Sequence, residues 1–248
     1  MMKKSNVTEA FQAFNDINSA FGGLTEWYAR GVQESSGLTL KQRALMSIAC
    51  DVCEQTLYGS LEFHIKMALE NGATRQDVKE AILHMGVYGA YPKCFETIAR
   101  LKEIYTEFDQ KGLYLTGDKV SHPKPEHNWI LDTDVKDGLI AFEPQYGDLS
   151  SRMAGEVWGR PGLTPMERVY ISISGDVCQQ TLSADGPFPF HANLCLQNGM
   201  TRKQVREMIM YLTVDVGFLR VWNALEALNA HFTRLDSQIA EPLAGSRK

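Results

Sequence analysis

The chain is poor in cysteine, has no long apolar run and has no cluster of basic residues. Its five cysteines are an odd number in 248 residues and do not suggest a disulfide framework. No window approaches the roughly 18 apolar residues that a membrane span needs, and no secretory signal follows the two N-terminal lysines. With a net charge of −5, nucleic acid and anionic membranes are poor candidate partners. We therefore expect a cytoplasmic protein.

Several motifs that bind cofactors or activate nucleophiles are also missing. The sequence has no metal-ligand spacing, no glycine-rich phosphate loop and no serine-centred elbow. We therefore expect no metal and no cofactor. What the composition does supply is 44% apolar and 22% charged residues, the balance of a chain that folds around a packed core.

The sequence contains one unit twice. Residues 37–57 read GLTLKQRALMSIACDVCEQTL and residues 162–182, which lie 125 positions later, read GLTPMERVYISISGDVCQQTL, with 12 of the 21 positions identical. Residues 64–84 and 191–211 form a second pair, offset by 127 positions, with 9 of 21 identical. The repeat predicts a first module over 1–106 and a second, more divergent module over 132–248, joined by a linker over 107–131.

The boundary signals in both copies are those of helices. Each expected helix start is a threonine with Gln, Asp or Glu three residues later, which is the pattern of a capping box, and Asn-Gly pairs are typical of helix ends. The apolar residues between them recur at helical spacing, and no segment shows convincing strand alternation. We therefore predict an all-α fold. The starts are at Thr39, Thr74, Thr164 and Thr201, and the stops are at 71–72 and 198–199.

Taken together, three motifs resemble the carboxymuconolactone decarboxylase family, which includes the alkylhydroperoxidase-D-like proteins. They are Leu-Thr-x-x-x-Arg, a histidine followed by an Ala-x-x-x-Gly-x-Thr turn, and Tyr-x-x-x-Pro; the resemblance covers most of both copies. The residues that carry them in copy one are Leu38, Thr39, Arg43, His64, Ala68, Gly72, Thr74, Tyr88 and Pro92. The resemblance implies tandem antiparallel helical bundles of the alkylhydroperoxidase-D-like type, with an active site between helices near the family histidine.

The same resemblance implies partners. Single-module members of the family form trimers or hexamers, so a fused pair implies a homotrimer of pseudo-dimers, with the active site close to a subunit or module interface. A small molecule is the implied substrate. The reaction itself is less specific, because the family contains decarboxylases, peroxidases and proteins of unknown role.

Two histidines are the first catalytic candidates. His64 precedes the small-residue turn of copy one, and His191 has the same position in copy two. A neutral imidazole titrates near physiological pH and can deliver or remove a proton. The resemblance implies that this histidine takes part in the proton transfer that accompanies or follows loss of CO2. The alternative is a buried histidine bonded to a backbone carbonyl.

Cys50 and Cys53 form a C-x-x-C pair on a predicted helix, with both thiols roughly on one face. Such a pair permits a redox interpretation. The alkylhydroperoxidase members, however, have C-x-x-C-x-x-x-H, whereas Leu57 follows Cys53 at that distance and Gly175 replaces Cys50 in copy two. The peroxidase motif is therefore absent, and the alternative is two buried thiols that pack as small apolar groups.

The segment Asp-Val-Cys-x-Gln-Thr-Leu occurs in both copies, at 51–57 and 176–182. It places an acid, a cysteine and a glutamine in the middle of an otherwise apolar predicted helix. Because an unpaired buried carboxylate is costly, Asp51 needs a partner or a cavity. Either it pairs with Arg43 or caps the next loop, or Asp51 and Cys53 line the pocket beside the histidine.

Two positions near the histidine differ from the family pattern or differ between the two copies. The family decarboxylases carry a glutamate four residues before the histidine, where this chain has Ser60 and, in copy two, Pro187. Tyr88 matches the family tyrosine and is a candidate to orient a substrate carboxylate, but copy two has Asp215 there. Because copy two departs further, we expect one active site per chain, built mainly from copy one.

Three functions are compatible with these residues. The first is a cofactor-independent lyase, decarboxylase or isomerase that acts on a small carboxylated lactone or unsaturated acid, with a histidine as proton donor or acceptor. The second is a thiol-dependent peroxidase or disulfide reductase that uses Cys50 and Cys53. The third is a non-catalytic oligomeric binding protein. We carry the first forward, and its candidate residues are His64, His191, Cys53, Asp51 and Tyr88.

Overall fold

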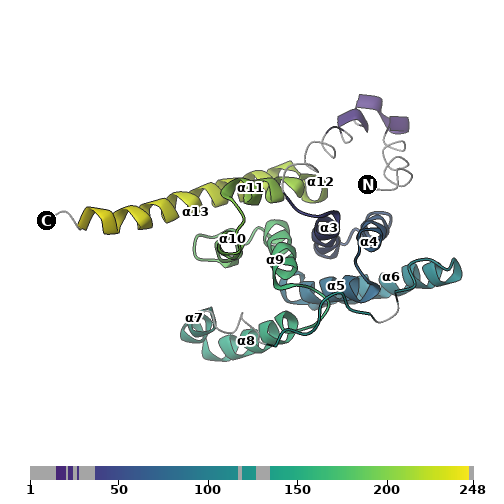
Figure 1. Cartoon of the computed structure of the whole chain (residues 1–248), viewed down its shortest axis with the longest axis horizontal. Helices are drawn as coiled ribbons and strands as arrows, with labels where there is room; N and C mark the ends of the chain where they lie inside the picture. Colours follow the sequence, from purple (N-terminus) through teal and green to yellow (C-terminus); the bar gives the residue numbers. More distant parts are fainter. Residues whose placement is uncertain are drawn as a thin grey trace. The chain divides into compact units, whose positions relative to one another are not determined.

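The computed structural model describes residues 15–20, 22–24, 27, 37–116, 119–126 and 135–245. Every regular element in these ranges is a helix and none of their residues lies in a strand, which confirms the all-α prediction (Figure 1). None of these helices combines the length and apolar character needed to cross a lipid bilayer. The helices are α3 (Leu40–Glu54), α4 (Ser60–Glu70), α5 (Arg75–Gly89), α6 (Tyr91–Gln110), α7 (Val135–Phe142), α8 (Pro144–Trp158), α9 (Pro165–Gln179), α10 (Pro187–Gln197), α11 (Arg202–Tyr211), α12 (Thr213–Val216) and α13 (Phe218–Gly245).

The repeat in the sequence is a repeat of helices. In the alignment of the two copies, α9 corresponds to α3, α10 to α4 and α11 to α5, and the start of α13 corresponds to the start of α6. At Thr74, Thr164 and Thr201 the hydroxyl accepts from the backbone N–H three residues later, and the side chain of that residue accepts from the threonine N–H. Gly72 follows the end of α4, and Gly199 follows the end of α10. Their φ angles are 96° and 91°, a backbone conformation that residues with a side chain rarely adopt. The predicted starts and stops at these positions are confirmed.

Helix contacts divide the chain into two compact units, residues 40–179 and residues 1–39 with 180–248. The larger unit contains α3 to α9, and the smaller contains α10 to α13. This division differs from the repeat because α9, the first repeated helix of copy two, packs against α3 and α5 of copy one. The module boundaries at 106 and 132 stay a prediction, and 117–118 and 127–131 of the proposed linker lie outside the described residues.

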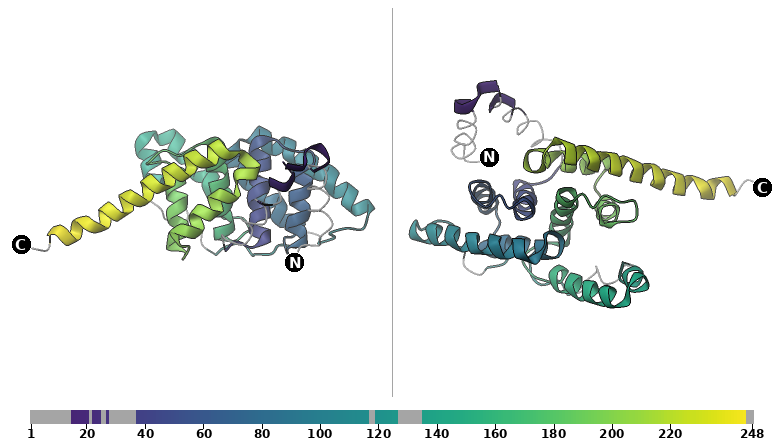
Figure 2. Two further views of the ribbon diagram at one scale, coloured as in Figure 1. Left: turned by 90° about the horizontal axis from the view of Figure 1, so that it is seen from above. Right: turned by 180° about the vertical axis from the view of Figure 1, so that it is seen from behind.

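Helix α3 is the centre of the larger unit. It packs against α4, α5, α6 and α9, and Figure 1 shows it with α4 on one side and α9 on the other; Figure 2 gives two further views. All its residues from Arg43 to Cys53 are buried, as are those of α9 from Glu167 to Cys178. A helix that is covered on all sides can hold a polar side chain only if that side chain has a partner.

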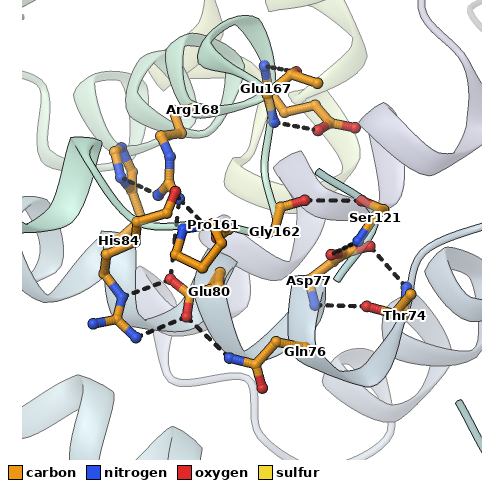
Figure 3. Close-up of polar contacts among 12 residues, drawn as sticks. Thr74, Gln76, Asp77, Glu80, His84, Ser121, Pro161, Gly162, Glu167 and Arg168 are labelled. Atoms are coloured by element: carbon orange, nitrogen blue, oxygen red, sulfur yellow. Dashed lines mark hydrogen bonds and ion pairs between the residues drawn. The ribbon is translucent and has the colours of Figure 1, made fainter. Parts of the chain in front are cut away.

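A buried polar network fastens the start of α9 to α5 (Figure 3). Glu80 of α5 is fully buried and accepts from Arg160 at 2.7 and 2.8 Å. Arg168 of α9 donates to the carbonyl oxygens of Arg160 and Pro161 at 2.7 and 3.2 Å. Burial lowers the pKa of Arg168 to about 10, which leaves it charged at neutral pH. The network therefore joins a helix of copy one to a helix of copy two.

Ser121 of the predicted linker is held to the same helix. Asp77 of α5 is buried and accepts from the backbone N–H of Ser121 at 3.1 Å. The hydroxyl of Ser121 donates to the carbonyl of Gly162 at 2.8 Å, and Lys41 lies 3.0 Å from Glu167 (Figure 3 draws the contacts of Ser121). Part of the predicted linker is thus bonded to both copies.

Candidate active site

Asp51 and His64 are in direct contact. Nδ1 of His64, on α4, lies 2.7 Å from Oδ2 of Asp51, near the end of α3. Asp51 is 2% exposed and His64 is 8% exposed. An ionised carboxylate can only accept, so Nδ1 donates to Asp51. With Nδ1 as the donor to Asp51, a neutral His64 ring has its hydrogen on Nδ1.

The second oxygen of Asp51 has two further partners. The hydroxyl of Thr56 donates to Oδ1 at 2.5 Å, and the hydroxyl of Ser60 donates to the same atom at 2.7 Å. The buried carboxylate is therefore bonded at both oxygens. The structure combines two of the arrangements that the sequence allowed: Asp51 lies beside His64, and it also accepts from Thr56 and Ser60 in the next loop and at the start of the next helix. Arg43 is not its partner, and a pocket lined by Asp51 and Cys53 stays a prediction.

A left-handed residue brings these groups together. Helix α3 ends at Glu54, and Gln55 has φ of 59°, which reverses the chain and lets the N–H of Thr56 bond to the carbonyl of Asp51 at 3.2 Å. The amide of Gln55 donates to the carbonyl oxygens of Val52 and Lys93 at 2.8 and 3.1 Å. These bonds offset the cost of a conformation that residues other than glycine rarely adopt.

The same turn occurs in copy two. Gln180 has φ of 56°, and its amide donates at 3.2 Å to the carbonyl of Arg220, which is the repeat equivalent of Lys93. The expectation that this glutamine lies in the middle of a helix is therefore wrong. In both copies the glutamine directly follows the helix, α3 or α9, and its amide bonds to a backbone carbonyl of a later helix. This shared role explains why both copies have a glutamine at this position.

Cys50 and Cys53 lie in the packed contact between α3 and α9. All five cysteines of the chain are buried and free, so no disulfide joins them. Cys53 shares hydrogen bonds with Cys178 of α9, and these bonds, together with burial, raise the pKa of the Cys53 thiol far above its ordinary value. A thiol that resists ionisation is a poor nucleophile, so this environment disfavours a redox role.

Tyr88 belongs to a second buried cluster. Its ring stacks on His84 with the centroids 5.2 Å apart, as their spacing on α5 predicts, and burial raises the pKa of the Tyr88 hydroxyl. Nδ1 of His84 lies 3.4 Å from a guanidinium nitrogen of Arg168, so Nε2 carries the hydrogen and donates to Ser172 at 2.9 Å. The ring of Trp158 packs against His84 in a T-shaped arrangement, with the centroids 4.9 Å apart. His84 is thus packed in the core of the larger unit, and a role of Tyr88 toward a substrate stays a prediction.

The equivalent residues of copy two are also buried. His191 on α10 is in the smaller unit, and Asp176 on α9 is in the larger one. Thr181 is the equivalent of Thr56, but Pro187 replaces Ser60 and has no hydroxyl to donate. Copy two therefore lacks one of the two donors that bond to Asp51 in copy one.

Comparison with known proteins identifies the family. The model of the carboxymuconolactone decarboxylase family matches residues 20–103 and 144–230, which together are more than half of the chain. The chain belongs to the carboxymuconolactone decarboxylase family. One matched segment falls in each predicted module, so the resemblance and the tandem arrangement are both confirmed.

Two relatives of this family member are named as decarboxylases. The nitrosuccinic acid decarboxylase of Metarhizium robertsii is 32% identical over 91 residues, which are 37% of this chain and 63% of that protein. The match thus spans less than two thirds of that relative. The 4-carboxymuconolactone decarboxylase of Acinetobacter baylyi is 25% identical over 122 residues, 49% of this chain and 87% of that protein. The prediction of a carboxymuconolactone decarboxylase-like enzyme is confirmed at the level of the family.

A crystal structure shares the fold of this family member. It is of a protein from Burkholderia xenovorans LB400 assigned as a gamma-carboxymuconolactone decarboxylase subunit, and it aligns with a TM-score of 0.56 at 18% identity over 94% of this chain and 91% of that chain. At this identity the match concerns the fold alone. It supports the alkylhydroperoxidase-D-like bundle predicted from the sequence.

Two residues of the site were not predicted. Thr56 lies in the repeated Asp-Val-Cys-x-Gln-Thr-Leu segment, and its occurrence in both copies was a signal that could have singled it out. Ser60 was noted only because it stands where the family decarboxylases have a glutamate. Neither hydroxyl could be connected to Asp51 without knowing that the chain reverses at Gln55.

Proposed function

We propose that this protein is a cofactor-independent decarboxylase of a small carboxylated lactone or unsaturated acid, with His64 as the proton donor or acceptor. The bond of 2.7 Å between His64 and Asp51 supports this proposal most directly. A buried carboxylate that accepts from one ring nitrogen orients the imidazole and stabilises its protonated form. Both curated relatives are named for the removal of carboxyl groups from small acids, nitrosuccinic acid and 4-carboxymuconolactone.

The proposed reaction replaces a carboxylate by a hydrogen. The bond between the carboxylate and its carbon breaks, CO2 leaves, and the electron pair stays on the substrate, where the neighbouring unsaturated or carbonyl group delocalises it. Nε2 of the protonated His64 then gives its proton to a carbon of this delocalised system. The charge of Asp51 stabilises the imidazolium before this step, and the ring regains a proton from solvent afterwards. Such general acid catalysis contributes about 10²–10⁴-fold to a rate.

We place one such site in each chain, in copy one. Ser60 and Tyr88 are present there, whereas copy two has Pro187 and Asp215 at those positions. His191 and Asp176 are the equivalents of the proposed pair. On this proposal, loss of His191 reduces turnover less than loss of His64.

The test compares turnover of the wild type and of His64→Ala on 4-carboxymuconolactone and on nitrosuccinate, with CO2 release as the readout. We expect kcat/KM of the variant to fall by about 10²–10⁴-fold on the substrate that the wild type converts, with an unchanged helical circular dichroism spectrum. His231→Gln is the matched control, because His231 is another buried histidine, bonded to Asn193. Wild-type activity in His64→Ala would refute the role of the histidine.

The thiol-dependent alternative has weaker support in the structure. Cys50 and Cys53 are buried, and the hydrogen bonds and burial that raise the pKa of Cys53 disfavour its thiolate. Peroxide treatment followed by thiol titration separates the two functions. Consumption of a pair of thiols by stoichiometric peroxide would favour the reductase, and five intact thiols are expected for the decarboxylase.

A further inference from the structure

Two hydroxyl groups that the proposed reaction does not use converge on one oxygen of Asp51. Thr56 and Ser60 donate to Oδ1 at 2.5 and 2.7 Å, while Oδ2 faces Nδ1 of His64 at 2.7 Å. The three donors come from the turn after α3, from the first residue of α4 and from one turn further along α4. The carboxylate therefore joins the end of one helix to the start of the next.

These bonds restrict the rotation of the carboxylate. A side-chain carboxylate turns easily about its last torsion, since that torsion is broad and nearly two-fold. Two donors fixed on Oδ1 remove this freedom and leave Oδ2 directed at the imidazole. Donated hydrogen bonds also stabilise the charged form of a buried carboxylate, and only the charged form obliges the imidazole to be the donor.

The exposure of the three residues agrees with this arrangement. Asp51 is buried, Ser60 is half-buried and Thr56 is exposed. The exposed threonine is thus bonded inward, to a buried group on α3. Copy two keeps the threonine, as Thr181, but has Pro187 in place of the serine. The pair of donors is complete in copy one.

We infer that Thr56 and Ser60 are positioning residues, which act through Asp51 to keep the hydrogen of His64 on Nδ1 and so present Nε2 for proton exchange. The catalytic consequence rests on the proposed function. The tautomer of His64 does not, because it exists in the free protein and can be measured without substrate.

The experiment measures the tautomer directly. Full-length protein labelled with ¹⁵N in its histidine rings is observed by long-range proton–nitrogen correlation, and the His64 ring is assigned by its loss in His64→Gln. In the wild type we expect Nδ1 to have the shift of a protonated nitrogen. In Thr56→Val/Ser60→Ala we expect the population to move toward the form with the hydrogen on Nε2. Thr181→Val, at the equivalent position of copy two, is the matched control and leaves the His64 signals unchanged.

Activity and rescue provide the second readout. On the substrate that the wild type converts, we expect the double variant to lose kcat by about tenfold to 100-fold, because misplaced catalytic groups cost rate at this scale, with little change in KM. Ser60→Thr retains a hydroxyl and is expected to keep both the tautomer and most of kcat. If the double variant fails to fold, Ser60→Ala alone is measured in the same way.

The outcomes separate this inference from the proposed function. An unchanged His64 tautomer in the hydroxyl variants overturns the inference, even if their thermal stability falls, since a purely structural role would lower stability alone. A shifted tautomer together with full activity in His64→Ala would support the positioning and reject the proposed reaction. If the wild type converts neither substrate, the tautomer still decides whether Thr56 and Ser60 position the ring.

Discussion

At the scale of single residues, the partner of each buried charge determines what that charge can do. Asp51 and Glu80 are both buried carboxylates, yet Asp51 is bonded to an imidazole and two hydroxyls, and Glu80 to the guanidinium of Arg160. An imidazole next to a carboxylate can gain and lose a proton near neutral pH, whereas an arginine stays charged. We therefore assign chemistry to the first group and a structural role to the second.

The first residue-scale prediction concerns the carboxylate itself. Asp51→Asn keeps the shape of the side chain but removes the charge that stabilises the imidazolium, and its amide can reverse the tautomer of His64. By analogy with the aspartate of serine protease triads, we expect kcat/KM to fall by about 10²-fold to 10⁴-fold. Steady-state kinetics measures this. Asp109→Asn, which alters a carboxylate bonded to Arg75 at the surface, serves as the control and should retain activity.

A second residue-scale prediction concerns pH and the thiols. Burial raises the pKa of Cys94 to about 11 and that of Cys195 to about 12. Because the folded state holds these thiols neutral, their contribution to stability is complete below their unfolded pKa near 9 and is lost as the pH rises toward 11–12. We expect the free energy of unfolding to fall across this range in urea titrations. A thiol of the native protein that ionises below pH 8 would contradict this expectation.

At the scale of helices, the local signals could be read from the sequence and the tertiary ones could not. The capping boxes at Thr74, Thr164 and Thr201 involve residues three positions apart, so the sequence alone was sufficient to predict them. The left-handed Gln55 could not be predicted in this way, because its amide bonds to a carbonyl of α6, far along the chain. For the same reason, the hydrogen-bond partners of Asp51 could not be predicted from the sequence.

The prediction at this scale concerns the contact between α5 and α9. Glu80→Ala leaves the buried guanidinium of Arg168 without the carboxylate that lies 4.0 Å from it, and it also removes the partner of the partly exposed Arg160. Breaking a buried ion pair from one side costs about 3–5 kcal/mol. We expect chemical denaturation to show a loss of this size. Glu103→Ala, which removes an exposed carboxylate bonded to Arg100 at 2.8 Å, is the control and should cost about 1 kcal/mol or less. Equal losses in both variants would argue against a stabilising role for the network.

At the scale of the whole molecule, the duplication leaves matching apolar side chains exposed in both copies. Phe95 of α6 is 69% exposed and its repeat equivalent, Trp222 of α13, is 53% exposed; Tyr91 and Phe218 are a second such pair. Exposed aromatic residues favour association, and a chain with two equivalent surfaces is suited to a closed ring of copies. The homotrimer was predicted from the family resemblance, since the sequence alone cannot show which apolar residues stay exposed.

We therefore expect the purified protein to have a mass of about three chains in solution. Light scattering coupled to size-exclusion chromatography measures it. Phe95→Glu should shift the population toward smaller species, whereas Glu96→Gln, a change at the neighbouring exposed residue, should not. A wild-type protein that elutes as a clean monomer at micromolar concentration would refute the predicted assembly.

The central claim is that the imidazole of His64, oriented by Asp51, protonates the substrate carbon as CO2 leaves. The most direct measurement is turnover of 4-carboxymuconolactone and of nitrosuccinate in D2O by the wild type and by His64→Ala, with the deuterium content of the product determined by mass spectrometry. We predict that the wild type releases CO2 and places one deuteron on a carbon of the unsaturated system that carried the lost carboxylate, and that His64→Ala forms almost no product. Equal rates and equal deuterium incorporation by the two proteins would contradict the claim.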